Sequence, residues 1–121
     1  MKLKVTNYKL GIIWFIITTI LLCFPGHQFP TFDLFDKIQL DKIVHIFIFF
    51  GLTTLFILPS NSTHYLIITL LSSFYGVLME FIQKYFIPNR SFDIWDIAAD
   101  IVGSFLAYIL ITKYVEKKKP L

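Results

Sequence analysis

The chain has 121 residues, of which 56% are hydrophobic and only 16% are charged, and its mean hydropathy is +0.71. A soluble domain of this size buries only about 60–70% of the surface of its unfolded chain, which leaves little room for 14 Phe, 6 Tyr and 2 Trp. The composition excludes a disordered chain and argues against a soluble globular domain. The single cysteine, Cys23, excludes an internal disulfide and any paired-cysteine metal or redox motif. These observations indicate a small integral membrane protein.

Four apolar stretches follow one another along the chain, at about residues 8–24, 43–58, 65–82 and 94–112. Each is at the short end of the length that crosses a bilayer as a helix. None alternates between apolar and polar residues as the strands of a membrane β-barrel do. The sequence therefore predicts an all-α, polytopic membrane protein, with four transmembrane helices in a single domain of residues 1–121.

The lysines predict the orientation of these helices. They gather in the two terminal tails, as Lys2, Lys4 and Lys9 and as Lys113, Lys117, Lys118 and Lys119. Because positive charge next to a membrane span stays in the cytoplasm, both termini are expected to be cytoplasmic. We therefore interpret the net charge of +3 as a signal of membrane orientation. The expected partner is the lipid bilayer, and no nucleic acid is expected to bind.

With this topology, ionisable residues from three helices meet near the outer face of the membrane. They are Asp41, Lys42 and His45 around the start of the second stretch, Glu80 and Gln83 around the end of the third, and Arg90, Asp93, Asp96 and Asp100 around the start of the fourth. The i, i+4 spacing of Asp96 and Asp100 puts both carboxylates on one helix face. Since ionisable groups within membrane spans face the bundle interior or a wet cavity, these residues predict one polar site.

This predicted site has more negative than positive groups. Five carboxylates, at positions 41, 80, 93, 96 and 100, stand against Lys42 and Arg90, with His45 neutral. Such a layer needs extra protons, a bound cation or a cationic ligand. A divalent cation such as Mg, Ca or Mn would suit the oxygen ligands.

We assign expected roles to the members of the site. Glu80, His45 and Asp96 are the candidate catalytic residues, with Glu80 or His45 as the acid or base. Arg90 and Lys42 would contact an anionic, lipid-linked or headgroup substrate, together with Gln83, Asp41, Asp93 and Asp100. More ordinary roles stay open: Asp41 and Asp93 can cap helices, and Asp96 or Asp100 can pair with Arg90. Gly51, Gly76, Gly103 and Ser104 are expected to be helix-packing contacts.

The same residues resemble the VanZ-like family in combination. The pattern comprises D-K-x-x-H from Asp41 to His45, E-x-x-Q from Glu80 to Gln83, P-x-R-S-x-D-x-x-D from Pro88 to Asp96, and Gly103. One position departs from the family, which usually has Asn where this chain has Asp100. An aspartate there has to be protonated or paired in order to replace the amide.

The resemblance implies a multi-pass protein of the bacterial cell membrane. The founding member of the family is associated with resistance to the glycopeptide teicoplanin, so the resemblance implies a cell-envelope role but no defined reaction. Whether the chain is an enzyme stays open, as does its oligomeric state. One alternative is a non-enzymatic assembly or partner subunit, in which the polar layer is an ion-pair network that fixes helix register. A third is a small transporter or flippase, which the sequence favours least because no polar stripe is evident on the inner side.

Overall fold

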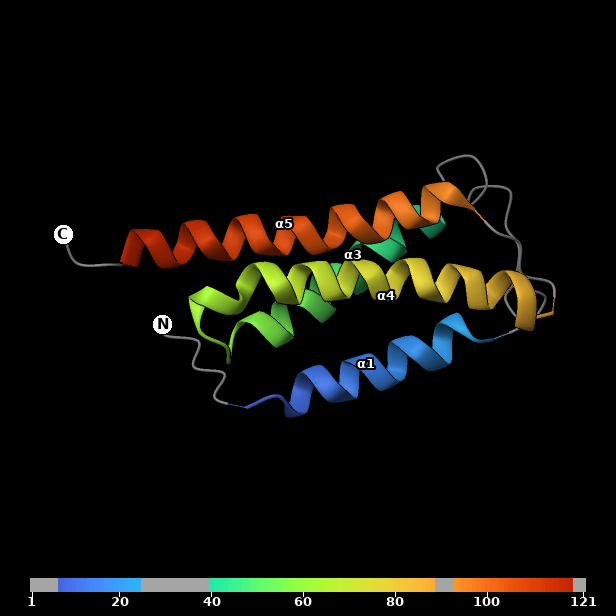
Figure 1. Cartoon of the computed structure of the whole chain (residues 1–121), viewed down its shortest axis with the longest axis horizontal. Helices are drawn as coiled ribbons and strands as arrows, with labels where there is room; N and C mark the ends of the chain where they lie inside the picture. Colours follow the sequence, from blue (N-terminus) through green and yellow to red (C-terminus); the bar gives the residue numbers. More distant parts are fainter. Residues whose placement is uncertain (1–6, 25–39, 89–92, 119–121) are drawn as a thin grey trace.

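The computed structural model describes residues 7–24, 40–88 and 93–118, with the side chains in these ranges except those of Leu40, Asp41 and Lys118. All regular structure in these ranges is helical (Figure 1). The elements are α1 (Lys9–Leu22), α3 (Leu40–Ile57), the short 3-10 helix η2 (Ser62–His64), α4 (Tyr65–Phe86) and α5 (Ile94–Lys118). The all-helical prediction is confirmed, and each of the four apolar stretches forms one helix.

Three helices are longer than the apolar stretches that predicted them. Helix α3 begins at Leu40 instead of residue 43, α4 continues to Phe86 and α5 continues to Lys118. The extensions contain Lys, Gln and Glu, which are good helix formers although they end a hydropathy signal. Helix α4 ends where Ile87 turns extended, because the residue before a proline, here Pro88, avoids the helical conformation.

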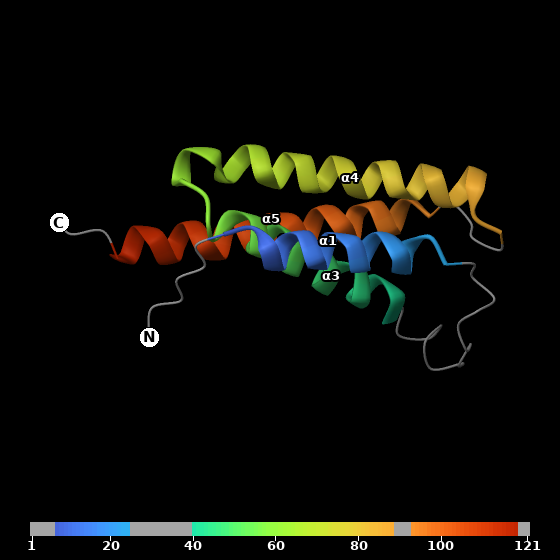
Figure 2. The ribbon, with the colours of Figure 1, turned by 90° about the horizontal axis from the view of Figure 1, so that it is seen from below.

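The four long helices lie side by side and alternate in direction (Figures 1 and 2). Helix α5 packs most extensively against α3 and then against α4, while α1 packs mainly against α3. The start of α1 and the end of α5 lie at one end of the bundle. The opposite end, here called the polar end, gathers the ends of α1 and α4 with the starts of α3 and α5.

Glycines allow the central helices to approach closely. A Cβ atom on Gly103 of α5 would collide with the backbone of Ile46 on α3. A Cβ atom on Gly76 of α4 would lie 2.8 Å from the Cβ atom of Asp100 on α5. The expected packing role of these two glycines is confirmed, and Gly76 also makes room for a predicted site residue.

Polar side chains fill much of the bundle interior, while large apolar side chains cover its surface. The buried polar residues are Thr18, His45, Thr53, Thr69, Ser72, Ser73, Glu80, Gln83, Asp100 and Ser104. By contrast, Phe47 is 69% exposed, Phe74 64% and Leu71 61%. Exposed apolar area on this scale marks a surface that contacts something other than water.

Within the described ranges, two segments are long and apolar enough to cross a membrane, Ser62–Phe86 and Ile94–Lys117. Helix α1 and the Lys42–Ile57 part of α3 are apolar but shorter. The bundle buries only 39% of the most apolar 18-residue stretch of Ser62–Phe86. It buries only 33% of the corresponding stretch of Ile94–Lys117. A core helix of a soluble protein would be covered by its neighbours to a greater extent.

Candidate functional site

Six of the predicted site residues meet at the polar end of the bundle. We call them the ionic cluster: Lys42 and His45 of α3, Glu80 of α4, Asp93 just before α5, and Asp96 and Asp100 of α5. Positions 42, 80 and 100 are far apart in the sequence, and only the alternating helix directions bring them together. The structure therefore brings these six residues together at one end of the bundle.

Lys42 bridges two carboxylates at the rim of the cluster. Its Nζ atom donates to Asp93 Oδ2 at 2.5 Å and lies 2.6 Å from Asp96 Oδ1. The contact with Asp96 is an ion pair. All three side chains remain partly exposed, so water and small molecules can reach this part of the cluster.

Asp93 also caps α5, as one of the open alternatives predicted. Its Oδ1 atom accepts the backbone N–H of Trp95 at 2.9 Å, while its other oxygen pairs with Lys42. A carboxylate at this position satisfies an amide that the first turn of a helix leaves without a partner. The hydrogen bond from Lys42 lowers the pKa of Asp93 below its usual value.

His45 and Asp100 form the deeper pair of the cluster. The Nδ1 atom of His45 lies 2.7 Å from Asp100 Oδ1, and its Nε2 atom lies 3.9 Å from Asp96 Oδ2. Asp100 is only 1% exposed, and the missing side chain of Gly76 makes room for it. The Asp100 carboxylate is thus paired with an imidazole.

Glu80 is buried beneath the start of α5. It is 1% exposed, and its Oε1 atom accepts the backbone N–H of Asp93 at 2.6 Å. One turn further along α4, Gln83 donates from Nε2 to the carbonyl oxygen of Leu22 at 2.8 Å. The two side chains therefore join α4 to the start of α5 and to the end of α1, and Gln83 satisfies a terminal carbonyl that α1 leaves free.

Two predicted site residues are not placed by these observations. Arg90 lies outside the described residues, and Asp41 belongs to α3 but its side chain lies outside them. Within the described cluster, four carboxylates face the cations Lys42 and, when protonated, His45. Carboxyl groups therefore outnumber cations among the described members of the cluster, whereas Arg90, which the predicted charge balance included, lies outside them.

No group of three or more His, Cys, Asp or Glu side chains among the described residues is arranged to hold a metal ion. The divalent cation that the sequence left as one possibility therefore has no ligand set among the described side chains. The carboxylate oxygens that would supply one already contact Lys42, His45 and the Asp93 amide.

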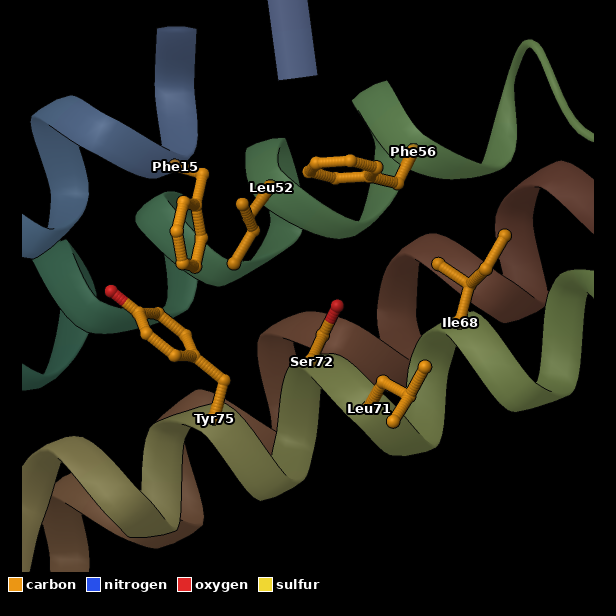
Figure 3. Close-up of a pocket in the computed structure, with 7 residues that line it drawn as sticks. All are labelled: Phe15, Leu52, Phe56, Ile68, Leu71, Ser72 and Tyr75. Carbon is orange, nitrogen blue, oxygen red and sulfur yellow. The ribbon is translucent and has the colours of Figure 1, made fainter. Parts of the chain in front are cut away.

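A separate pocket of about 210 Å³ lies between α1, α3 and α4 (Figure 3). Its lining is mostly apolar and comprises Phe15, Leu52, Phe56, Ile68, Leu71, Ser72 and Tyr75. At its edge the Tyr75 hydroxyl is 2.5 Å from the hydroxyl of Thr19 on α1. None of the predicted site residues lines this pocket, and the sequence contains no motif that would have indicated it.

Comparisons with known proteins leave the family of the chain open. No protein-family model matches it, and no solved structure matches it significantly. The chain is 35% identical over 82 residues to an uncharacterized protein of the fission yeast Schizosaccharomyces pombe. This match covers 64% of the chain and 50% of the relative, so the chain spans about half the length of the fungal protein it matches.

Proposed function

We propose that the chain is a VanZ-like, multi-pass membrane protein of the bacterial cell envelope, with four spans and both termini in the cytoplasm. The exposed apolar surface and the polar interior support a lipid environment around the bundle. The alternating helix directions and the lysines of both tails support an even number of crossings. The polar end of the bundle then faces outward.

The ionic cluster is the proposed working site, and its excess of carboxylates is the observation that carries the proposal. Lys42, Asp93 and Asp96 form a partly exposed rim, while Glu80 and Asp100 lie beneath it. A lipid-linked or headgroup substrate would meet the rim first, with Lys42 contacting its anionic group. Glu80 and His45 would be the groups that exchange protons with it. By the family resemblance, the outcome for the cell would be tolerance to teicoplanin.

A second candidate function has its own support. Glu80 accepts a backbone amide and Gln83 donates to a helix-terminal carbonyl, and both are bonds that hold helices together. A network of this kind can fix helix register without taking part in any reaction. The chain would then be a non-enzymatic assembly or partner subunit of the membrane.

One substitution separates the two candidates. In Glu80→Gln the side-chain oxygen can still accept the Asp93 amide, but the group can no longer exchange a proton at neutral pH. We would express the parent and Glu80→Gln at matched membrane levels in a teicoplanin-sensitive Gram-positive host and measure susceptibility. Protection by the parent alone supports a working site that needs an ionisable Glu80. Equal protection supports the structural network, and no protection by the parent contradicts the teicoplanin role.

A further inference from the structure

Polar residues continue along α5 beyond the ionic cluster. From Asp96, every fourth position is polar or hydroxyl-bearing: Asp96, Asp100, Ser104, Tyr108, Thr112 and Glu116. Residues four apart are neighbours on a helix surface, and each step of four turns by about 40°, so the series winds part-way round α5 from one end to the other. At 1.5 Å per residue this stripe is about 30 Å long. A length of about 30 Å is also the thickness of the hydrocarbon layer of a bilayer.

The neighbouring helices add buried hydroxyl groups to this stripe. Thr53 of α3 and Thr69 of α4 are fully buried, as is Ser104 of α5, and Ser73 of α4 is nearly so. Because α5 packs against both α3 and α4, these groups lie within one three-helix interior. We call the set the polar column: Thr53, Thr69, Ser73, Asp100, Ser104, Tyr108, Thr112 and Glu116. It extends toward the inner side, where the sequence suggested no polar stripe.

Three hydroxyl groups in the column have no hydrogen-bond partner among the described residues. They are the buried oxygen atoms of Thr53, Ser104 and Thr112. A buried hydroxyl without a partner costs about 1–3 kcal/mol, so such groups in proteins are usually bonded to internal water. By contrast, Thr69 and Ser73 donate to the carbonyl oxygens one turn earlier in α4, which leaves their lone pairs able to accept.

The column ends in a pocket opposite the ionic cluster. This pocket has a volume of about 200 Å³ and is lined by Ser62, Tyr65, Tyr108, Thr112, Val115 and Glu116. A carboxylate therefore stands at each end of the column, Asp100 beside His45 at one end and Glu116 at the other.

We propose that the interior of the bundle is a proton path, which runs from His45 and Asp100 through water-bridged hydroxyls to Glu116. A hydroxyl group both donates and accepts, so it can take a proton from one water molecule and release its own to the next. Each relay group ends the step unchanged, and the net event is transfer of one proton from the water at one end to the water at the other. Chains of ionisable groups inside membrane bundles are typical of proton relays.

Thr53→Val gives the sharpest test. It keeps the shape of the side chain and removes only a hydroxyl that has no hydrogen-bond partner among the described residues, so we expect the variant to fold about as well as the parent. Thr18→Val is the matched control, because Thr18 is equally buried but belongs to α1, which contributes nothing to the column. The full chain would be reconstituted into phospholipid vesicles that contain a pH-sensitive dye. A potassium diffusion potential set with valinomycin would drive the protons.

We expect the internal pH of vesicles that contain the parent protein to change much faster than the internal pH of protein-free vesicles. Thr53→Val should lower this flux about tenfold, and Thr18→Val should leave it unchanged. A parent flux no greater than that of protein-free vesicles would overturn the proposal. Equal fluxes for the parent and folded Thr53→Val would overturn it as well. Ser104→Ala, which removes the second unpartnered hydroxyl, repeats the test if Thr53→Val fails to fold.

Discussion

Glu80 Oε1 accepts the backbone N–H of Asp93 at 2.6 Å, so the last turns of α4 hold the residue that caps α5. Asp93 in turn pairs with Lys42 of α3. Two residues thus connect three helices at the polar end of the bundle. This arrangement gives Glu80 a positioning role whether or not it also exchanges protons.

The Glu80 contact predicts different effects for two substitutions. Glu80→Gln keeps an oxygen that can accept the Asp93 amide, and we expect little change in the thermal stability of the purified protein. Glu80→Leu leaves this amide without its acceptor and should lower the free energy of unfolding by about 1–3 kcal/mol. Thermal unfolding in detergent measures both. If Glu80→Leu were as stable as the parent, the hydrogen bond between Glu80 and the Asp93 amide would contribute nothing to the stability of the protein.

Spacing and topology were enough to predict that the residues of the ionic cluster lie together, and they left helix capping open as an alternative role of Asp93. They could not reveal that Glu80 bonds a backbone amide or that Gln83 bonds the Leu22 carbonyl, because no sequence pattern specifies contacts between distant helices. The polar column was also missed. Its threonines and serines stand singly or in pairs within apolar stretches, where they resemble ordinary packing residues until the helices are placed together.

The His45–Asp100 pair should behave as one unit. Asp100→Leu leaves the buried imidazole without its partner, whereas the double variant His45→Leu/Asp100→Leu removes both polar groups. We expect the double variant to be more stable than the sum of the single losses predicts, with a coupling energy of about 0.5–3 kcal/mol. A double-mutant cycle of unfolding free energies measures this coupling. If the losses of unfolding free energy in the two single variants simply add up in the double variant, the two side chains do not act as a pair.

Asp100→Asn tests the departure from the VanZ-like pattern. An asparagine oxygen can still accept from the His45 ring, and the site returns to the residue that the family usually has. We expect the membrane yield of Asp100→Asn to equal that of the parent. A yield as low as that of Asp100→Leu would mean that the charge of Asp100, and not only its hydrogen bond, holds the pair together.

The glycines predict a graded series of alanine substitutions. Gly103→Ala should be most damaging, because the added Cβ would meet the backbone of Ile46, which cannot rotate away. Gly76→Ala would crowd Asp100 and should cost about 1–3 kcal/mol. Gly11→Ala, the control, faces only the Phe56 ring at 3.1 Å and should be mild. Equal stability of all three variants would contradict the close helix contacts.

The lowered pKa of Asp93 predicts a loss of stability in acid. A group whose pKa falls on folding stabilises the protein above its unfolded pKa and loses this effect as the pH drops through the folded pKa. For Asp93 the loss should begin below about pH 4, the ordinary pKa of an aspartate. Unfolding temperatures of the parent and Asp93→Asn between pH 3 and 6 check this. The difference between the two proteins should shrink toward the acid end, and a constant difference would argue against the Lys42 pair.

The orientation of the polar end is the claim on which the proposed function depends, and cysteine labelling tests it most directly. In a Cys23→Ser background, one variant carries Phe86→Cys at the exposed end of α4 and the other carries Thr63→Cys in η2. Both would be treated with a membrane-impermeant maleimide. We predict that Phe86→Cys reacts in intact cells and that Thr63→Cys reacts only after the membrane is opened. The reverse pattern, or reaction of both in intact cells, would contradict an ionic cluster that faces the cell envelope.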